Sequence, residues 1–413
     1  MKSLLLLSSC LTVLTSTALA GLFSLQEEAE ETVNQIVVFG DSYSDVGNKQ
    51  RLSNGPLWSE HLAAGWNASH YNFAFSGAVC NNTMYAKQPL SEHYIPSIVD
   101  QVEMYYRQNY SFHQETAVSF WVGVSDVYKI LETHEDPDII QQEFKKVVDC
   151  IGTNLRHVRQ AFSHTKFIVF NVPPMEYMPL YAHTEKAEKK KEAVIQLNEM
   201  LRKDIEKMNK HLQAIELDLV DVHKLIQDIV DKPGLFGIQN PQDAYWDHCQ
   251  GQCADPIDSY VWWDKTHLTG GIHRLIANSI LMSGSLAKET YLDDQLNVQQ
   301  LLNQPHSIYR SPIFKAHQAT GLMDRLIAEM NQKQHSTNQG SGSDLSQDEI
   351  SSSSSHSQLA YLAIAGVAVV GLAAFIVKKK NKTGQLAALS GLIHKNNQDR
   401  GRFMPLRNLD SEV

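Results

Sequence analysis

The strongest restriction on the fold of this 413-residue chain comes from short apolar runs that alternate with longer helix-like segments between residues 30 and 290. The apolar runs are typical of buried β-strands, and two of the segments between them, 139–162 and 184–212, are long enough for helices. Such alternation predicts a mainly parallel sheet with helices on both faces. The five strand candidates are QIVVF (35–39), HYNFAF (70–75), AVSFWV (117–122), KFIVFN (166–171) and IELDLVDV (215–222).

The first apolar run stops abruptly at Gly40, Asp41 and Ser42, within VVFGDSYSDVGN. In open α/β sheets, ligands bind beyond the carboxyl ends of the strands, so Ser42 stands where a reactive residue is expected. Glycine, aspartate and serine are also residues that favour turns. Taken alone, this tripeptide fits either a catalytic nucleophile or an ordinary turn.

The partners that a nucleophilic serine needs occur in compact form in YVWWDKTHLTGG. Asp264 and His267 are three residues apart, so on a turn the carboxylate can contact one ring nitrogen and leave the other free to accept the serine proton. The backbone N–H of Ser42 can serve an oxyanion hole, and Gly77 in NFAFSGAV allows a second N–H to approach a ligand closely. Ser125 in WVGVSDVY follows the third strand candidate, at the same edge of the sheet.

Together these blocks resemble the GDSL or SGNH hydrolases, especially the plant- and fungal-type secreted esterases. The blocks are FGDSYSDVGN, NFAFSGA, WVGVSDVY and the Asp264-x-x-His267 pair, and they follow the family's order over most of residues 30–290. NVPP (171–174), VDVHKLI (220–226) and the two cysteines just before YVWWD support the resemblance. It implies a three-layer α/β/α sandwich of the flavodoxin type.

The resemblance also implies a serine ester hydrolase. Ser42 would attack the ester carbonyl, His267 would act as general base and then acid, and Asp264 would orient His267. The N–H groups of Ser42 and Gly77 would bind the oxyanion. The family's third donor is the asparagine side chain of a Gly-x-Asn-Asp block, and here Ser125 takes that place. A serine hydroxyl is shorter than an asparagine amide and its direction is less fixed. Serine at this position is therefore expected to be a weaker oxyanion donor and to lower the rate of the reaction.

The expected substrates are small acyl esters, such as acetyl esters of carbohydrate or short-chain lipid esters. The alternative is a catalytically weak or inactive surface protein that keeps the fold and binds a sugar or a partner. Two features suggest it: serine at position 125 in place of asparagine, and the membrane tether described below. A metal-dependent hydrolase is disfavoured because DSYSDVGNKQRL has Val46 and Leu52 where a calcium loop has Gly and Glu. We therefore expect no metal and no cofactor. Trp262 and Trp263 either line the substrate site or pack in the core.

Both ends of the chain indicate a membrane-tethered protein of the secretory pathway or cell surface. Residues 1–20 read as a signal peptide cleaved after Ala20, with a retained anchor as the alternative. Residues 359–377 carry no charge and are long enough, at about 1.5 Å per residue, to span a bilayer as a helix. The segment 378–413 holds eight Lys or Arg against three Asp or Glu, which predicts a cytoplasmic tail and a single-pass type I topology.

Between these ends, the expected hydrolase domain covers 21–290. A helical extension over 291–334 either caps the domain or continues into a Ser-rich stalk over 335–358. The formal net charge of −10 argues against nucleic acid as a partner, so the expected partners are an ester substrate and the membrane. Three sequons fit a glycosylated lumenal or extracellular domain, at Asn67, Asn81 and Asn109.

The mature chain would keep Cys80, Cys150, Cys249 and Cys253. Four cysteines in an oxidising compartment suggest two disulfides, for which three pairings exist. The favoured pairing joins Cys249 to Cys253 across a small loop and leaves Cys80 with Cys150. A zinc site is the rival, although Cys-x-x-x-Cys without a second close ligand pair is poor zinc spacing.

Overall fold

The computed structural model of the chain describes residues 32–85, 94–110, 115–212 and 215–339. Its centre is a five-stranded sheet in the order β2-β1-β3-β4-β5, in which every neighbouring pair is parallel. This confirms the predicted parallel α/β sheet. The strands are β1 (Gln35–Gly40), β2 (Ser69–Asn72), β3 (Thr116–Trp121), β4 (Lys166–Phe170) and β5 (Glu216–Val220).

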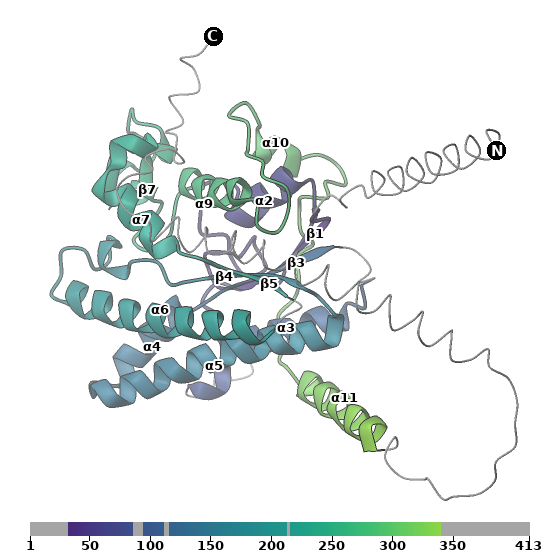
Figure 1. Cartoon of the computed structure of the whole chain (residues 1–413). Coiled ribbons are helices and arrows are strands. Elements are labelled where there is room, and N and C mark those ends of the chain that lie inside the picture. The colour runs from purple at the N-terminus through teal and green to yellow at the C-terminus, as the bar shows by residue number, and fades with distance from the viewer. Residues whose placement is uncertain (1–31, 86–93, 111–114, 213–214, 340–413) are drawn as a thin grey trace, which may run out of the picture.

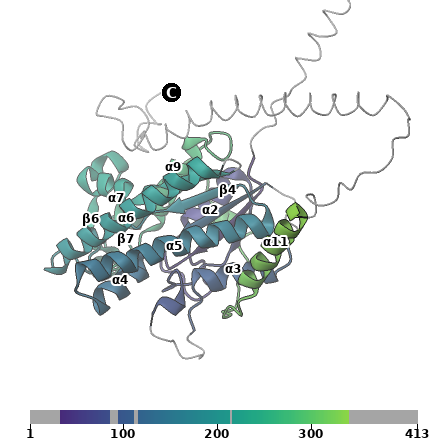
Figure 2. The same cartoon turned by 60° about the horizontal axis from the view of Figure 1, so that its bottom comes forward.

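Helices cover both faces of this sheet (Figure 1). One face carries α2 (Trp58–Trp66) and α9 (Gly270–Ser283), and the other carries α3 (Ile98–Arg107), α5 (Pro137–Phe162) and α6 (Lys186–His211). In Figure 2, α5 and α6 run side by side in front of the sheet. Because both faces are covered, β1, β3 and β4 are buried along their whole length, and their sequences are mainly apolar. The shorter helices are α4 (Val124–Thr133), α7 (Val222–Asp231), α8 (Tyr245–Cys249), α10 (Val298–Leu302) and α11 (Leu322–Gln339).

A small second sheet is formed by the chain that follows α7. It pairs β6 (Asn240–Ala244) in parallel with β7 (Tyr260–Trp262). Trp262 also forms an antiparallel bridge with Leu268. This bridge joins the two ends of a short loop, and the loop carries both Asp264 and His267.

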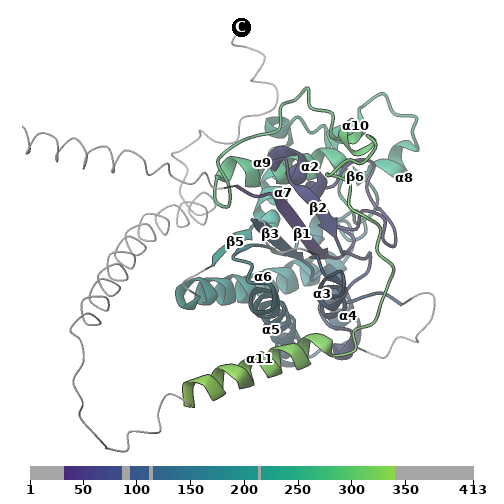
Figure 3. The same ribbon diagram turned by 90° about the vertical axis from the view of Figure 1, so that its right-hand side faces the viewer.

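The C-terminal part of the described chain is helical over only part of the expected range 291–334. Helix α10 and helix α11 are separated by an extended segment that contains Pro305 and Pro312, which remove backbone donors and interrupt helices. This segment runs beside β2, the edge strand, as Figure 3 shows. There the N–H of His70 donates to the carbonyl of Ile308 at 2.9 Å.

Several predicted segments lie outside the described residues. They are the signal peptide (1–20), the membrane span (359–377), the cytoplasmic tail (378–413) and all but the first residues of the stalk (335–358). Among the helices of the described ranges, none has the length and apolar character needed to cross a membrane.

Candidate active site

The turn that carries Ser42 is fixed by the end of β1. Gly40 must be glycine there, because a Cβ atom would lie 2.8 Å from the carbonyl oxygen of Trp121. The side chain of Gln101, from α3, holds the Gly40 backbone on both sides: it accepts from the N–H and donates to the carbonyl, each at 2.9 Å. Ser42 itself is half-buried and sits in the turn that follows.

Asp264 and His267 are in direct contact. The ring Nδ1 of His267 lies 2.7 Å from Oδ2 and 2.9 Å from Oδ1 of Asp264. Oδ1 also accepts the backbone N–H groups of Thr266 and His267, each at 2.8 Å. Burial alone would raise the pKa of Asp264, but the hydrogen bond and charge of the imidazole, with these two N–H groups, leave that pKa below its ordinary value. The carboxylate therefore stays ionised and fixes the orientation of the ring.

The turn after β1 and the 264–267 loop meet through Tyr43, the residue after Ser42. Its hydroxyl donates to the carbonyl of Thr266 at 2.5 Å, and its ring centroid lies 5.7 Å from that of His267. Tyr43 is fully buried and stacks on Trp121 of β3. The structure thus brings the serine turn and the histidine loop together at the carboxyl edge of the sheet.

The two further oxyanion candidates come from the neighbouring strands. Gly77 follows β2 and has a φ of +88°, a conformation that favours glycine. Ser125 is the second residue of α4 and is half-buried. Each lies on the first turn after its strand, as the strand pattern predicts.

Asp45 connects the serine turn to the Gly77 turn, and the sequence analysis did not single it out. This carboxylate is fully buried and accepts the N–H of Gly47 at 2.8 Å and that of Asn48 at 2.7 Å. Its Oδ2 accepts the N–H of Ser76 at 2.7 Å. The pattern Asp-x-Gly-Asn is typical of a side chain that bonds to its own following turn, and it could have indicated this role.

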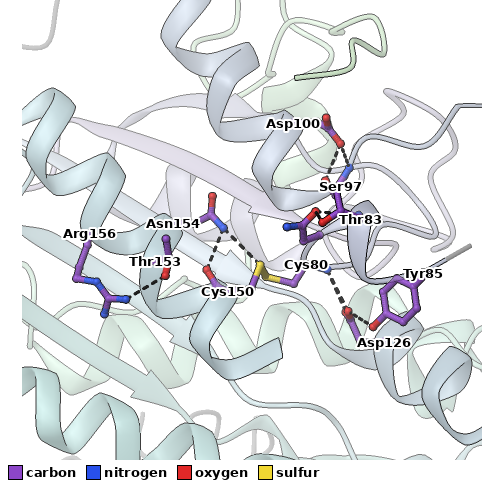
Figure 4. Close-up of a disulfide and its surroundings, with 11 residues drawn as sticks. Cys80, Thr83, Tyr85, Ser97, Asp100, Asp126, Cys150, Thr153, Asn154 and Arg156 are labelled. Carbon is purple, nitrogen blue, oxygen red and sulfur yellow. Dashed lines mark hydrogen bonds between the residues drawn. A yellow bond between two sulfur atoms is a disulfide. The ribbon is translucent and has the colours of Figure 1, made fainter. Parts of the chain in front are cut away.

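Asp126, which follows Ser125 on α4, connects this helix to the chain just after the Gly77 turn; Figure 4 shows it beside Cys80 and Tyr85. Its carboxylate accepts the N–H of Cys80 at 3.2 Å and the hydroxyl of Tyr85 at 2.7 Å. Burial raises the pKa of Asp126 to about 6, against the opposing effect of these hydrogen bonds. The two turns that carry the remaining oxyanion candidates are therefore tied to each other.

The described cysteines form the two favoured disulfides, Cys80–Cys150 and Cys249–Cys253. Cys80–Cys150 attaches the chain just after the Gly77 turn to α5, as Figure 4 shows. His248, Cys249 and Cys253 are also grouped closely enough to hold a metal ion, within 4.8 Å of one another. Because the two sulfurs are bonded to each other, neither is the thiolate that zinc requires, and the disulfide replaces the rival zinc site.

The sequons remain predictions, but their positions can be described. Asn67 and Asn109 are exposed and lie in left-handed turns at φ of 53° and 51°. Asn81 is half-buried and caps a short turn by accepting the N–H of Thr83 at 2.9 Å.

A family model described as GDSL-like lipase/acylhydrolase matches residues 36–280, which is more than half of the chain. An acetylesterase of Hypocrea jecorina is 22% identical over 355 residues, covering 70% of this chain and 99% of that protein. A thermolabile hemolysin of Vibrio parahaemolyticus is 22% identical over 287 residues, covering 62% of this chain and 65% of its own. Among solved structures, the lipase Lip_vut3 from a goat rumen metagenome is 13% identical, with a TM-score of 0.36 over 59% of this chain and 94% of that one.

Proposed function

The chain belongs to the GDSL-like lipase/acylhydrolase family, which hydrolyses carboxylic esters, and from this premise we propose that it cleaves short acyl esters with Ser42 as its nucleophile. The observation that carries the proposal is the 2.7 Å contact between Asp264 and the Nδ1 atom of His267. A carboxylate on Nδ1 holds the proton there and leaves Nε2 as the basic nitrogen. The Tyr43 contacts bring the turn of Ser42 against this histidine loop.

The proposed reaction has two halves. His267 takes the proton of Ser42 as Oγ attacks the ester carbonyl, and it then gives that proton to the departing alcohol oxygen. An acyl group remains on Ser42. Water, activated by the same histidine, attacks this acyl-enzyme and releases the carboxylic acid, which restores the free serine.

The negative charge that develops on the carbonyl oxygen needs preorganised donors. We assign this role to the backbone N–H groups of Ser42 and Gly77, with Ser125 as the third donor. The network around Asp45 and Asp126 would hold these turns in place, since Asp45 bonds to its own following turn and to Ser76, and Asp126 on α4 bonds to Cys80 and Tyr85.

We propose acetyl esters of carbohydrate, or short-chain lipid esters, as the substrate class. The name of the Hypocrea jecorina relative, an acetylesterase, supports the first of these. The two disulfides fit a domain that faces an oxidising compartment outside the cytosol. A single-pass anchor at 359–377 would keep such a domain at a membrane surface.

The test is to compare wild type with Ser42→Ala for labelling by a fluorophosphonate probe and for hydrolysis of p-nitrophenyl acetate. We expect labelling and turnover in the wild type and loss of both in the variant, because no other side chain replaces the attacking oxygen. Ser279→Ala is the matched control, since that hydroxyl donates to the carbonyl of Ile276 within its own helix. Undiminished labelling of Ser42→Ala would contradict the assignment of the nucleophile.

Replacing Ser125 with asparagine tests the oxyanion assignment. An amide reaches further than a hydroxyl and its direction is better fixed, so we expect Ser125→Asn to raise kcat on p-nitrophenyl acetate at least about tenfold, part of the roughly 10²–10³-fold that one such donor supplies elsewhere. If the wild type folds but shows neither labelling nor turnover, and Ser125→Asn stays silent too, the alternative of a non-catalytic binding protein is favoured.

A further inference from the structure

An exposed tryptophan lies close to the proposed catalytic loop and has no part in the mechanism above. Trp246, on α8, is 56% exposed, whereas Trp262 is fully buried and Trp263 is half-buried. The ring centroids of Trp246 and Trp263 are 5.5 Å apart. Trp263 also stacks nearly parallel to Tyr245, at 5.9 Å and 16°. These three rings form an aromatic platform in which Trp246 is the exposed ring, supported by the half-buried Trp263 and the buried Tyr245. Figure 3 labels α8, the helix of Tyr245 and Trp246, beside β6.

Backbone hydrogen bonds join the aromatic platform to the proposed base. The N–H of Trp246 donates to the carbonyl of Trp263 at 3.0 Å, and the N–H of Trp263 donates to the carbonyl of His267 at 2.7 Å. Asp264 follows Trp263 directly in the chain. The start of α8 is therefore fastened beside the loop that carries Asp264 and His267, and for this reason we consider the substrate as the occupant of the exposed ring.

The surroundings of the platform indicate which part of a substrate it fits. Asp247 and Lys265 lie 3.7 Å apart with 52% and 63% of their side chains exposed, and Asp243 and His248 lie 3.8 Å apart with 52% and 53% exposed. Among these exposed charged and polar side chains, a fatty acyl chain would stay in contact with water. A sugar ring has an apolar C–H face that can stack on an indole and a rim of hydroxyls that can bond to carboxylates.

We propose that Trp246 binds a sugar ring of a carbohydrate ester, so that the substrate class of the proposed esterase is an acylated saccharide; this rests on the proposed function. The aromatic platform is held before the substrate arrives. The Cys249–Cys253 disulfide closes the end of α8, and the sulfur of Cys249 lies 3.2 Å from the hydroxyl of Tyr260 on β7. A preformed platform loses little freedom on binding, which favours affinity.

The first measurement is binding, made on protein that also carries Ser42→Ala so that nothing is consumed. Calorimetric titration uses an O-acetylated xylo-oligosaccharide as the probe. We expect Trp246→Ala to raise the Kd roughly three- to tenfold, the range for loss of one aromatic stacking contact, and Trp246→Phe to raise it less. Tyr291→Ala is the matched control, because Tyr291 is an exposed aromatic residue (60%) elsewhere on the surface, and it should leave the Kd unchanged.

The second measurement uses the catalytically intact protein. The ratio of kcat/KM for the oligosaccharide to that for p-nitrophenyl acetate should fall by a similar three- to tenfold factor in Trp246→Ala. An unchanged Kd in Trp246→Ala, or no binding with Trp246 intact, would overturn the proposal. A matching loss with p-nitrophenyl laurate would also overturn it, by assigning the platform to the acyl chain. Failure of the esterase itself would appear as absent turnover, and the binding measurement would still decide the role of Trp246.

Discussion

Asp41, the residue before the proposed nucleophile, is a carboxyl group sealed inside the protein. One oxygen accepts the N–H of Tyr43 at 3.1 Å, and the other, Oδ2, has no hydrogen-bond partner within the described ranges. Burial raises the pKa of Asp41 to about 8; the Tyr43 hydrogen bond opposes this, and the nearby Asp126 adds to it. Asp41 is therefore mainly protonated at neutral pH, and it supports the Ser42 turn as a neutral group.

This burial makes the stability of the fold depend on pH. The raised pKa means that the folded state holds the Asp41 proton more tightly than the unfolded state, so its contribution is complete below about pH 4 and is lost as the pH rises towards 8. Over about pH 6.5 to 8, the free energy of unfolding of the wild type should fall by about 1–2 kcal/mol more than that of Asp41→Asn. Urea denaturation at a series of pH values measures both slopes.

Asp218 provides the control for this measurement. It is also buried, and burial raises its pKa to about 6. Most of its proton is therefore lost below about pH 6.5, so Asp218→Asn should keep nearly the wild-type slope between about pH 6.5 and 8. Equal slopes in wild type and Asp41→Asn would show that Asp41 is already ionised in the folded protein.

The strands could be predicted from the sequence because a parallel sheet covered on both faces leaves mainly apolar runs, and the two long helices because the segments between those runs are long enough. The run at 166–171 is β4 except for its last residue, and the helix-like stretch 139–162 is most of α5. HYNFAF is strand only as far as Asn72, because the chain then leaves the sheet to form the Gly77 turn. The small sheet was missed, because β6 reads NPQDA, which has neither apolar alternation nor a continuous apolar run.

In the candidate site, too, some residues could be predicted from the sequence and others could not. Ser42, Asp264 and His267 could be proposed because they stand in short blocks whose spacing suits the chemistry. The role of Asp45 and Asp126 could not be predicted, although both lie within these blocks, because acidic residues are usually exposed, and only the folded chain shows each of them buried and accepting backbone N–H groups. Trp246 was missed for the opposite reason, since a lone tryptophan is more often assigned to the core than to the surface.

The chain from 307 to 322 lies along β2 and covers that edge of the main sheet. The hydroxyl of Ser311 accepts the N–H of Asn72, so residues of the edge strand that would otherwise face solvent are paired. Further along, the N–H groups of Thr320 and Leu322 donate to Glu103, which is nearly fully buried. Burial would raise the pKa of Glu103, but these N–H groups and Arg107 lower it to about 2. The segment is therefore fastened to the sheet edge and to α3.

Phe314 is the apolar contact at the centre of this segment, and it also reaches the serine loop. Its ring stacks on Phe73 at 4.1 Å, and its N–H donates to the side chain of Asn48 at 2.8 Å. The amide of Asn48 in turn donates to the carbonyls of Asn72 and Ala74. The segment thus connects the sheet edge to the loop that follows Ser42.

Phe314→Ala should lower the free energy of unfolding by about 3 kcal/mol, because it removes a buried ring that the surroundings cannot fully replace. The neighbouring Ile313 is 61% exposed, so Ile313→Ala should change stability by less than about 0.5 kcal/mol. Urea denaturation of the two variants at one pH compares residues that are adjacent in sequence and opposite in burial. If both variants unfold at the same urea concentration as the wild type, the segment after α10 does not stabilise the domain. The part of the chain that unfolds cooperatively would then end before residue 307.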